Sequence, residues 1–147
     1  MQLILDSNIV ISALISPNGV IANIIFQKLK GAVLFAPNYL FHEVLNKQDK
    51  IIAITGYTDN EFLDLLHILT KKIDFIDESL ISENILIEAY QLTHQIDDKD
   101  TYYVALSLQT NLKIWTGDKI LIKGLRKKGF KNIIDTKELL EYIDNSS

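Results

Sequence analysis

Four acidic residues lie next to short apolar runs that have the composition of buried β-strands. Asp6 follows "LIL" directly, and Asp118 follows "KIW" after two residues. Glu43 lies in "PNYLFHEV", after the run "VLFA", and Asp100 begins "DTYYVALSL", which leads into the run before Asp118. In open α/β sheets, ligands bind beyond the carboxyl ends of the strands. These positions therefore predict that the four acids converge at one end of a sheet.

Four carboxylates within a few ångströms repel one another strongly unless a divalent cation lies among them. The chain has no cysteine, and a set of oxygen ligands alone suits Mg²⁺ or Mn²⁺. Each acid also has a structural interpretation, because an acid after a strand or at a helix start can cap the helix and face its positive end. A glutamate on a helix can simply face solvent. The joint position of the four acids favours a metal site over these alternatives.

The elements that position these acids alternate between strands and helices. Four short apolar runs predict strands at residues 2–5, 32–36, 112–115 and 132–134, and the run at 73–76 is a candidate for a fifth. Helix-like stretches lie at residues 20–30, 59–72 and 82–95, from Asp100 onward, and at 136–143. Gly31 suits the position after a helix end, and Ser82 suits an N-cap. The alternation predicts a three-layer α/β/α fold with a mostly parallel central sheet of four to five strands.

Length and composition predict one globular domain. The chain has 147 residues, of which 48% are hydrophobic, enough for a substantial core. No apolar run approaches the roughly 20 residues that a membrane span needs, so no membrane association is expected. The start, "MQLILDSNIV", has no basic segment and does not predict a signal peptide. The lack of cysteine excludes disulfides and thiolate chemistry, and it agrees with a cytoplasmic location.

The charge distribution is uneven along the chain. A formal net charge of −4 excludes a globally basic nucleic-acid-binding protein. After the single acid Asp118, however, six cations follow within a short stretch: Lys119, Lys123, Arg126, Lys127, Lys128 and Lys131. Such a cluster can be a solvated helix face, or it can bind a phosphate backbone. The sequence alone leaves both interpretations open.

Four segments together resemble the PIN-domain family, the metal-dependent ribonuclease fold of VapC-like toxins. These segments are "LILDSNIVISAL", "APNYLFHEVLNK", "DDKDTYYVALSL" and "WTGDKILIKG". The resemblance extends from Leu3 to about Ile143 and implies a single PIN domain over residues 1–147. One departure is that Asp135-Thr136 stands where many relatives have Thr-Pro before the last helix.

The resemblance implies that Asp6, Glu43, Asp100 and Asp118 form the catalytic quartet. Asp6, Asp100 and Asp118 would hold Mg²⁺ or Mn²⁺, and Glu43 would orient a water molecule or take its proton. Three polar residues would support the site: Asn8, Thr116 and the additional acid Asp97.

The implied substrate is single-stranded or looped RNA. The basic residues Lys119, Lys123, Arg126, Lys127 and Lys128 would attract its backbone to the rim of the acidic site. Tyr102 and Tyr103 either stack on bases or pack in the core, and His42 either contacts substrate or lies on the surface. A toxin-type relative also implies a protein antitoxin and a homodimer.

Two other functions remain open from the residues. The first is a Mg²⁺-dependent phosphatase or phosphotransfer domain with Asp6 as nucleophile. A phosphatase of the haloacid-dehalogenase type needs a second aspartate two residues later, where this chain has Asn8. The second alternative is a catalytically silent PIN-like module that only binds RNA or protein, and the presence of all four acids disfavours it.

Overall fold

The computed structural model describes residues 1–146 and has a five-stranded, all-parallel sheet at its centre. The spatial order of the strands is β3-β2-β1-β4-β5. The strands are β1 (Gln2–Leu5), β2 (Val33–Pro37), β3 (Ile73–Ile76), β4 (Lys113–Trp115) and β5 (Ile133–Ile134). The prediction of a parallel sheet of four to five strands is confirmed, including the strand at 73–76. The predicted domain ends at residue 147, which lies outside the described residues.

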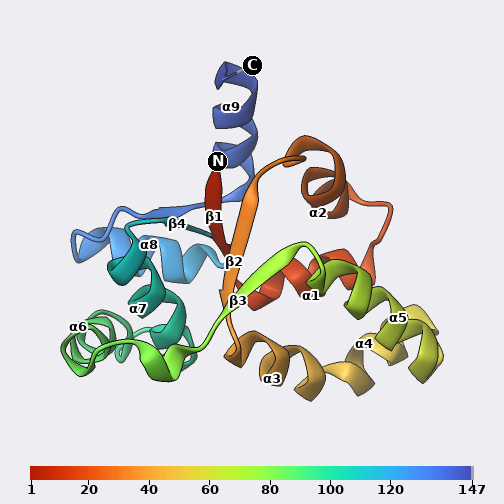
Figure 1. The fold of residues 1–147 in the computed structure, drawn as a ribbon, viewed down its shortest axis with the longest axis horizontal. Coiled ribbons are helices and arrows are strands. Elements are labelled where there is room, and N and C mark those ends of the chain that lie inside the picture. Colours follow the sequence, from red (N-terminus) through yellow and green to blue (C-terminus); the bar gives the residue numbers. More distant parts are fainter. Residues whose placement is uncertain (147) are drawn as a thin grey trace.

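Helices cover both faces of the sheet and give a three-layer α/β/α fold (Figure 1). In Figure 1, α1 (Ser7–Ile15), α2 (Val20–Asn23) and α5 (Asp59–Thr70) lie on one side of the strands, and α6 (Glu83–Thr93), α7 (Thr101–Thr110) and α8 (Lys119–Lys127) lie on the other. The remaining segments are the π-helical turn η1 (Ile24–Lys28), α3 (Tyr39–Asn46), α4 (Gln48–Thr55), the 3₁₀ turns η2 (Glu78–Leu80) and η3 (Asp98–Asp100), and α9 (Thr136–Ser146). Right-handed crossovers in the two directions from β1 produce this division.

The strand order reverses between β1 and β4. The chain runs from β1 to β2 and β3 on one side and then crosses to β4 and β5 on the other. The amide of Asp6 continues the pairing by donating to the carbonyl of Trp115 over 3.1 Å. A sheet of this kind has its crevice at the reversal point, beyond the carboxyl ends of the strands. Asp6 and the turn after Trp115 therefore lie where a ligand site is expected.

The core holds this edge of the sheet rigidly. The central strands are buried on both faces, and Ile4, Leu5 and Trp115 have no exposed surface. The indole nitrogen of Trp115 donates to the hydroxyl of Thr136 over 3.0 Å, which links β4 to α9. Burial of this size fixes the backbone at the ends of β1 and β4, from which the polar residues of the site project.

The predicted helix at 20–30 differs from the observed one. The chain forms the short helix α2 and then a wide π-helical turn, in which the amide of Leu29 donates to the carbonyl of Ile24 over 2.8 Å. A regular α-helix would align Leu29 with Ile25, whereas the wide turn stacks Leu29 on Ile24, five residues earlier, and all three residues are buried. Gly31, with a φ of +86°, then reverses the chain toward β2.

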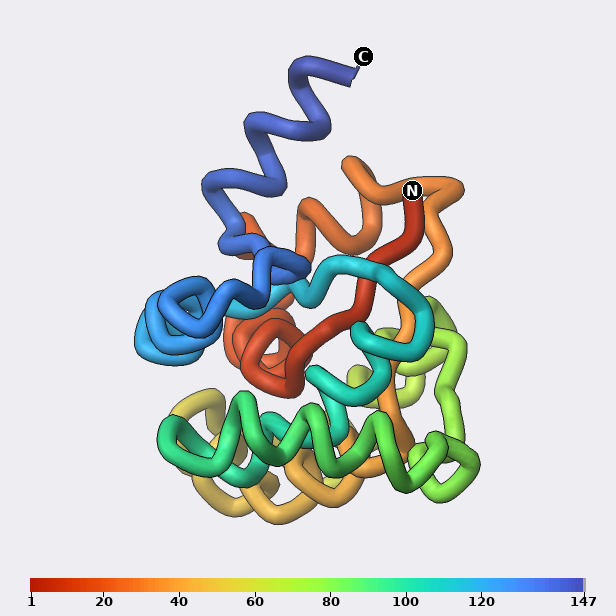
Figure 2. Tube along the Cα trace, turned by 90° about the vertical axis from the view of Figure 1, so that its left-hand side faces the viewer, coloured from red at the N-terminus to blue at the C-terminus, as the bar shows by residue number. Residues whose placement is uncertain are grey.

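The other four predicted helices agree with the structure to within a few residues, and α4 was not among the predicted helices. Ser82 caps α6 as predicted, and its hydroxyl accepts from the amide of Ile85. At α9, Asp135 and Glu138 accept from each other's amides over 2.8 and 3.1 Å, so a capping box replaces the proline of many relatives. This helix projects from the body of the molecule (Figure 2).

No single helix within residues 1–146 is long and apolar enough to span a membrane. Ser7–Ile15 and Val20–Lys28 meet the length and hydropathy criterion only when they are joined across a bend of 110°.

Candidate active site

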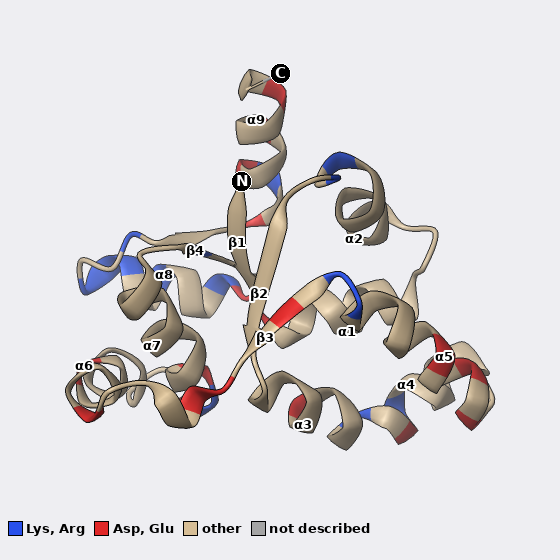
Figure 3. Ribbon diagram, in the orientation of Figure 1, with Lys and Arg blue, Asp and Glu red and all other residues tan. Residues whose placement is uncertain are grey.

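An acidic cavity of about 410 Å³ lies at the carboxyl ends of β1 and β4. All four predicted acids line it together with Asp97: Asp6, Glu43, Asp97, Asp100 and Asp118. Figure 3 shows that acidic positions on α3 and just before α7 come close to this end of the strands. The expected convergence of the acids is therefore present in the fold.

Asp6 is held at the bottom of the cavity by side chains. It is 4% exposed, and its Oδ2 accepts from the Thr116 hydroxyl over 2.7 Å and from the Asn8 amide over 3.0 Å. In the described part of the chain, its side chain makes no capping hydrogen bond to α1, so the interpretation of Asp6 as a helix cap is wrong. Burial raises the pKa of its carboxyl, and the Thr116 hydrogen bond opposes this rise.

The predicted supporting residues Asn8 and Thr116 connect Asp6 to the turn that carries Asp118. The amide of Asn8 also donates to the Thr116 hydroxyl over 3.1 Å, and its Oδ1 accepts from the backbone amide of Gly117 over 3.0 Å. The Thr116 hydroxyl accepts from the backbone amide of Asp118 over 3.0 Å. This network fixes the relative positions of the two carboxylates that follow β1 and β4.

Asp100 is a buried acid of the cavity with a strongly raised pKa. It is 8% exposed, and its Oδ2 is buried without a hydrogen-bond partner among residues 1–146. Burial, together with the negative charges of Asp6, Asp97, Asp118 and Glu43, raises the pKa of its carboxyl to about 8. It lies at the N-cap position of α7, but its side chain makes no capping hydrogen bond within the described residues. A helix cap therefore does not explain it.

Glu43 reaches the cavity from α3 and is held by a buried tyrosine. Its Oε1 accepts from the hydroxyl of Tyr103 over 2.6 Å, and Tyr103 is 1% exposed on α7. Burial raises the pKa of Glu43, and the Tyr103 hydrogen bond lowers it. The pKa of Tyr103 is raised by burial and by the charge of Glu43, so the phenol remains a donor. Tyr103 thus packs in the core and also orients Glu43.

Asp118 and Asp97 line the cavity and also cap helical turns. Oδ1 of Asp118 accepts from the amides of Ile120 and Leu121 at the start of α8, both over 3.0 Å. Oδ1 of Asp97 accepts from the amide of Lys99 over 3.0 Å. The structural interpretation therefore holds for both residues, and it does not exclude a second role because each carboxylate has another oxygen.

The chain matches the model of a known family. A family model described as "PIN domain" matches residues 4–140, which is most of the chain. The chain belongs to the PIN-domain family. The predicted family is thereby confirmed.

Solved structures show the same fold as this PIN domain. VapBC2 from Rickettsia felis, solved bound to a DNA fragment from its promoter, is similar with a TM-score of 0.66 and 16% identity, over 92% of this chain and 97% of that chain. PAE2754 from Pyrobaculum aerophilum is similar with a TM-score of 0.66 and 18% identity, over 99% of both chains. No curated protein is significantly similar in sequence.

The chemistry of the cavity of this PIN domain fits a divalent cation. As the side chains stand, residues 1–146 contain no group of three or more His, Cys, Asp or Glu residues arranged to hold a metal ion. The lining nevertheless supplies five carboxylates, and Oδ2 of Asp100 is buried without a partner among residues 1–146. Mutual repulsion contributes to the raised pKa values of Asp6 and Asp100, and a cation among the carboxylates would relieve it. Binding of a cation thus requires the acidic side chains of the cavity to move, but it requires no residue from outside the cavity.

Two cations of the basic cluster after Asp118 form contacts within the protein. The guanidinium of Arg126 contacts both carboxylate oxygens of Glu138 at 2.9 Å and donates to the carbonyl of Ile133, so it joins α8 to α9 and β5. The ammonium of Lys128 donates to the carbonyls of Gln91 and Leu92 at the end of α6. Both side chains thus have partners within the protein, and their contact with RNA stays a prediction.

Three exposed lysines of the cluster remain at four-residue spacing along one side of α8. Lys119, Lys123 and Lys127 line a hollow beside this helix. Lys131 is also exposed, in the segment before β5. The first of the three lysines directly follows Asp118, so the row begins at the rim of the acidic cavity.

Two cations of the cavity were missed by reasoning from the sequence. Lys47 and Lys99 both line it. Lys47 lies four residues after Glu43, and this spacing could have indicated the pair. Likewise, Tyr103 lies three residues after Asp100 on the same helix and could have been found by its spacing. Nothing in the local sequence distinguishes Lys99 from a solvated lysine.

Proposed function

We propose that this PIN domain is a Mg²⁺- or Mn²⁺-dependent endoribonuclease and the toxin of a toxin–antitoxin pair. The observation that carries the proposal is the buried, unpartnered oxygen of Asp100 in a cavity lined by four further acids. An arrangement of this kind destabilises the metal-free protein, and it has no structural purpose that the fold reveals. Nucleases of the PIN family generally use divalent metal ions, which supports the metal requirement.

The proposed roles follow from the contacts of each residue. Asp6, Asp100 and Asp118 would hold the cation, which supplies positive charge against the phosphate oxygens when it is bound. Glu43, oriented by Tyr103, accepts a proton from the water that attacks phosphorus. Asn8 and Thr116 keep Asp6 and the turn of Asp118 in register.

The substrate and partners are proposed from charge and from the relatives. The lysine row of α8 would bind the RNA backbone as it leaves the acidic cavity, because each phosphate contact releases counterions. The similarity to VapBC2 supports a protein antitoxin as partner, and we further propose a homodimer in the cytoplasm.

Cleavage of a mixed RNA pool tests the proposal. We expect internal cleavage in Mg²⁺ or Mn²⁺, mapped by sequencing of the new ends, and no cleavage in EDTA. Asp118→Asn keeps a residue that caps helices as well as aspartate does, yet it removes a carboxylate from the site. We expect it to fold as the parent does and to lose roughly 100-fold or more of the rate. Hydrolysis of p-nitrophenyl phosphate without RNA cleavage would indicate the phosphatase alternative and contradict the proposal.

A further inference from the structure

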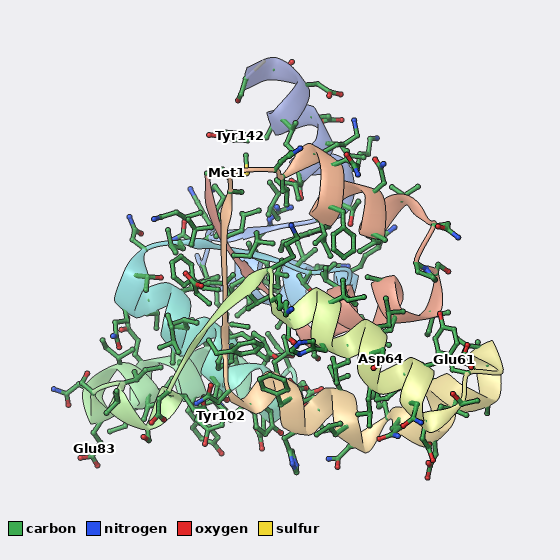
Figure 4. All side chains as sticks on the ribbon, turned by 45° about the vertical axis from the view of Figure 1, so that its right-hand side comes forward. Met1, Glu61, Asp64, Glu83, Tyr102 and Tyr142 are labelled. Carbon is green, nitrogen blue, oxygen red and sulfur yellow. The ribbon has the colours of Figure 1, made fainter. Side chains whose placement is uncertain are left out.

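Three aromatic side chains form a cluster where α3 and α7 begin. The ring of Tyr39 meets the ring of Tyr102 edge-on at a centroid distance of 5.2 Å, and it lies 5.5 Å from the ring of His42 at a tilt of 31°. Tyr39 and Tyr102 are half-buried, and His42 is exposed. Tyr102 lies at the lower edge of the molecule in Figure 4, beside the first turn of α3. Part of this aromatic surface is therefore open to solvent.

The aromatic cluster adjoins the acidic cavity. Tyr39 precedes Glu43 by one turn of α3, and Tyr102 follows Asp100 by two residues. Tyr39 and Glu43 are four residues apart on α3, so they lie on the same side of this helix, and Glu43 lines the cavity. The rings therefore lie on the two segments that carry Glu43 and Asp100, next to the residues that line the cavity.

The hydroxyl groups show that these tyrosines differ from those used for packing. The hydroxyl of Tyr57 donates to the carbonyl of Leu14 over 2.7 Å, and that of Tyr103 donates to Glu43. Within residues 1–146, the hydroxyls of Tyr39 and Tyr102 form no hydrogen bond. The fold thus uses the hydroxyls of the first pair to join elements, whereas the second pair contacts its neighbours through its rings.

Cations accompany the aromatic rings on this rim. Lys47 and Lys99 line the same cavity, from the end of α3 and from the turn before α7. Aromatic rings next to cations are the combination that binds single-stranded nucleic acid, because bases stack on the rings while the cations follow the phosphates. Bases within a duplex are already stacked and are not available for this contact.

We propose that Tyr39, His42 and Tyr102 form a stacking platform for unpaired RNA bases next to the phosphate in the acidic cavity. The inference deepens the proposed ribonuclease function and rests on it. The platform holds the bases on one side of the cavity, and the lysine row of α8 binds the backbone on the other side. It therefore selects unpaired RNA over duplex RNA with little dependence on base identity.

Binding of a short unpaired RNA that carries 2-aminopurine tests the platform. Fluorescence quenching reports stacking, and EDTA is present so that binding is measured without cleavage. We expect Tyr39→Leu and Tyr102→Leu each to weaken binding about tenfold and to reduce the quenching, whereas Tyr39→Phe and Tyr102→Phe keep both. The dependence of binding on salt should not change, because no phosphate contact is lost. Binding of duplex RNA should be equal for all variants.

Tyr90→Leu is the matched control, because Tyr90 stacks on His94 at the end of α6, a helix that contributes no residue to the lining of the acidic cavity. It should bind unpaired RNA as the parent does. Leucine variants that bind and quench like the parent, or that lose unpaired and duplex RNA equally, would overturn the platform. Cleavage by the parent in Mg²⁺ is measured separately. A parent that cleaves RNA and leucine variants that bind normally would refute the platform alone, whereas stacking without cleavage would refute the proposed function alone.

Discussion

Replacing Asp100 by asparagine should make the metal-free protein less sensitive to pH. The folded-state pKa of Asp100 is about 8, and its ordinary value is 3.8. As the pH rises above 4, the unfolded chain releases this proton while the folded protein keeps it until about pH 8. Unfolding is therefore increasingly favoured over this range. Asparagine is neutral throughout, and the replacement breaks no capping hydrogen bond among the described residues.

The size of the effect follows from the two pKa values of Asp100. Each unit of difference corresponds to about 1.4 kcal/mol. Between pH 5 and pH 8, the parent should lose about 3–4 kcal/mol of unfolding free energy through this residue. The raised pKa values of Asp6 and Glu43 act in the same direction. With asparagine taken as equivalent to the neutral carboxyl, the variant should exceed the parent by about 1–2 kcal/mol at pH 5 and by about 5 kcal/mol at pH 8.

Urea unfolding in EDTA measures this difference. Trp115 is the only tryptophan and is fully buried, so its fluorescence reports loss of the core directly. Added Mn²⁺ should restore stability to the parent at pH 8 and should affect the variant much less, because binding stabilises only a folded site. Parallel stability curves for the two proteins from pH 5 to pH 8 would refute the view that Asp100 is a strained carboxylate.

Two further predictions concern the neighbours of the acids. Tyr103→Phe removes the donor to Glu43 and should lower the cleavage rate about tenfold or more, at a stability cost of about 1–3 kcal/mol. The control Tyr57→Phe removes a comparable hydrogen bond to Leu14 and should leave the cleavage rate unchanged. Equal losses of rate in the two variants would contradict the role of Tyr103. Glutamine at the three lysines of the α8 row should reduce the slope of log affinity against log salt by roughly 2, at about 0.7 per phosphate contact. Arg126→Gln should leave that slope unchanged because its guanidinium is paired with Glu138, and the opposite pattern in filter-binding titrations would favour a solvated lysine face.

Much of the fold could be predicted because each strand is a short apolar run with a clear boundary. The strands at residues 2–5 and 73–76 were predicted at their observed bounds, and the others to within one residue. The helix at 20–30 was wrong in detail because periodicity assumes a regular α-helix. The packing of Ile24 and Leu29 in the core is accompanied by a π-helical turn instead. Local patterns do not contain this tertiary packing.

The sequence predicts which acids line the candidate site, but it predicts the cations around the site less well. The acids follow strand ends, and the topology of a parallel sheet brings such positions together. The cations lie on exposed helices, where sequence does not show which are paired. Arg126 reaches Glu138 and Lys128 reaches the end of α6 only because α8 packs against those segments. Lys99 enters the cavity through a 3₁₀ turn that local sequence does not distinguish from the start of α7.

The rate of RNA cleavage by Asp6→Asn as a function of Mg²⁺ concentration tests the central proposal most directly. Asparagine keeps the volume of Asp6 and can still accept from Thr116 and Asn8 through its amide oxygen, so the variant should fold. It lacks the charge that would hold a cation at the bottom of the cavity. We predict that the parent cleaves with saturable dependence on Mg²⁺ and that the folded variant shows no cleavage above background. A folded Asp6→Asn protein that cleaves at the rate of the parent would contradict the proposed metal-dependent nuclease site.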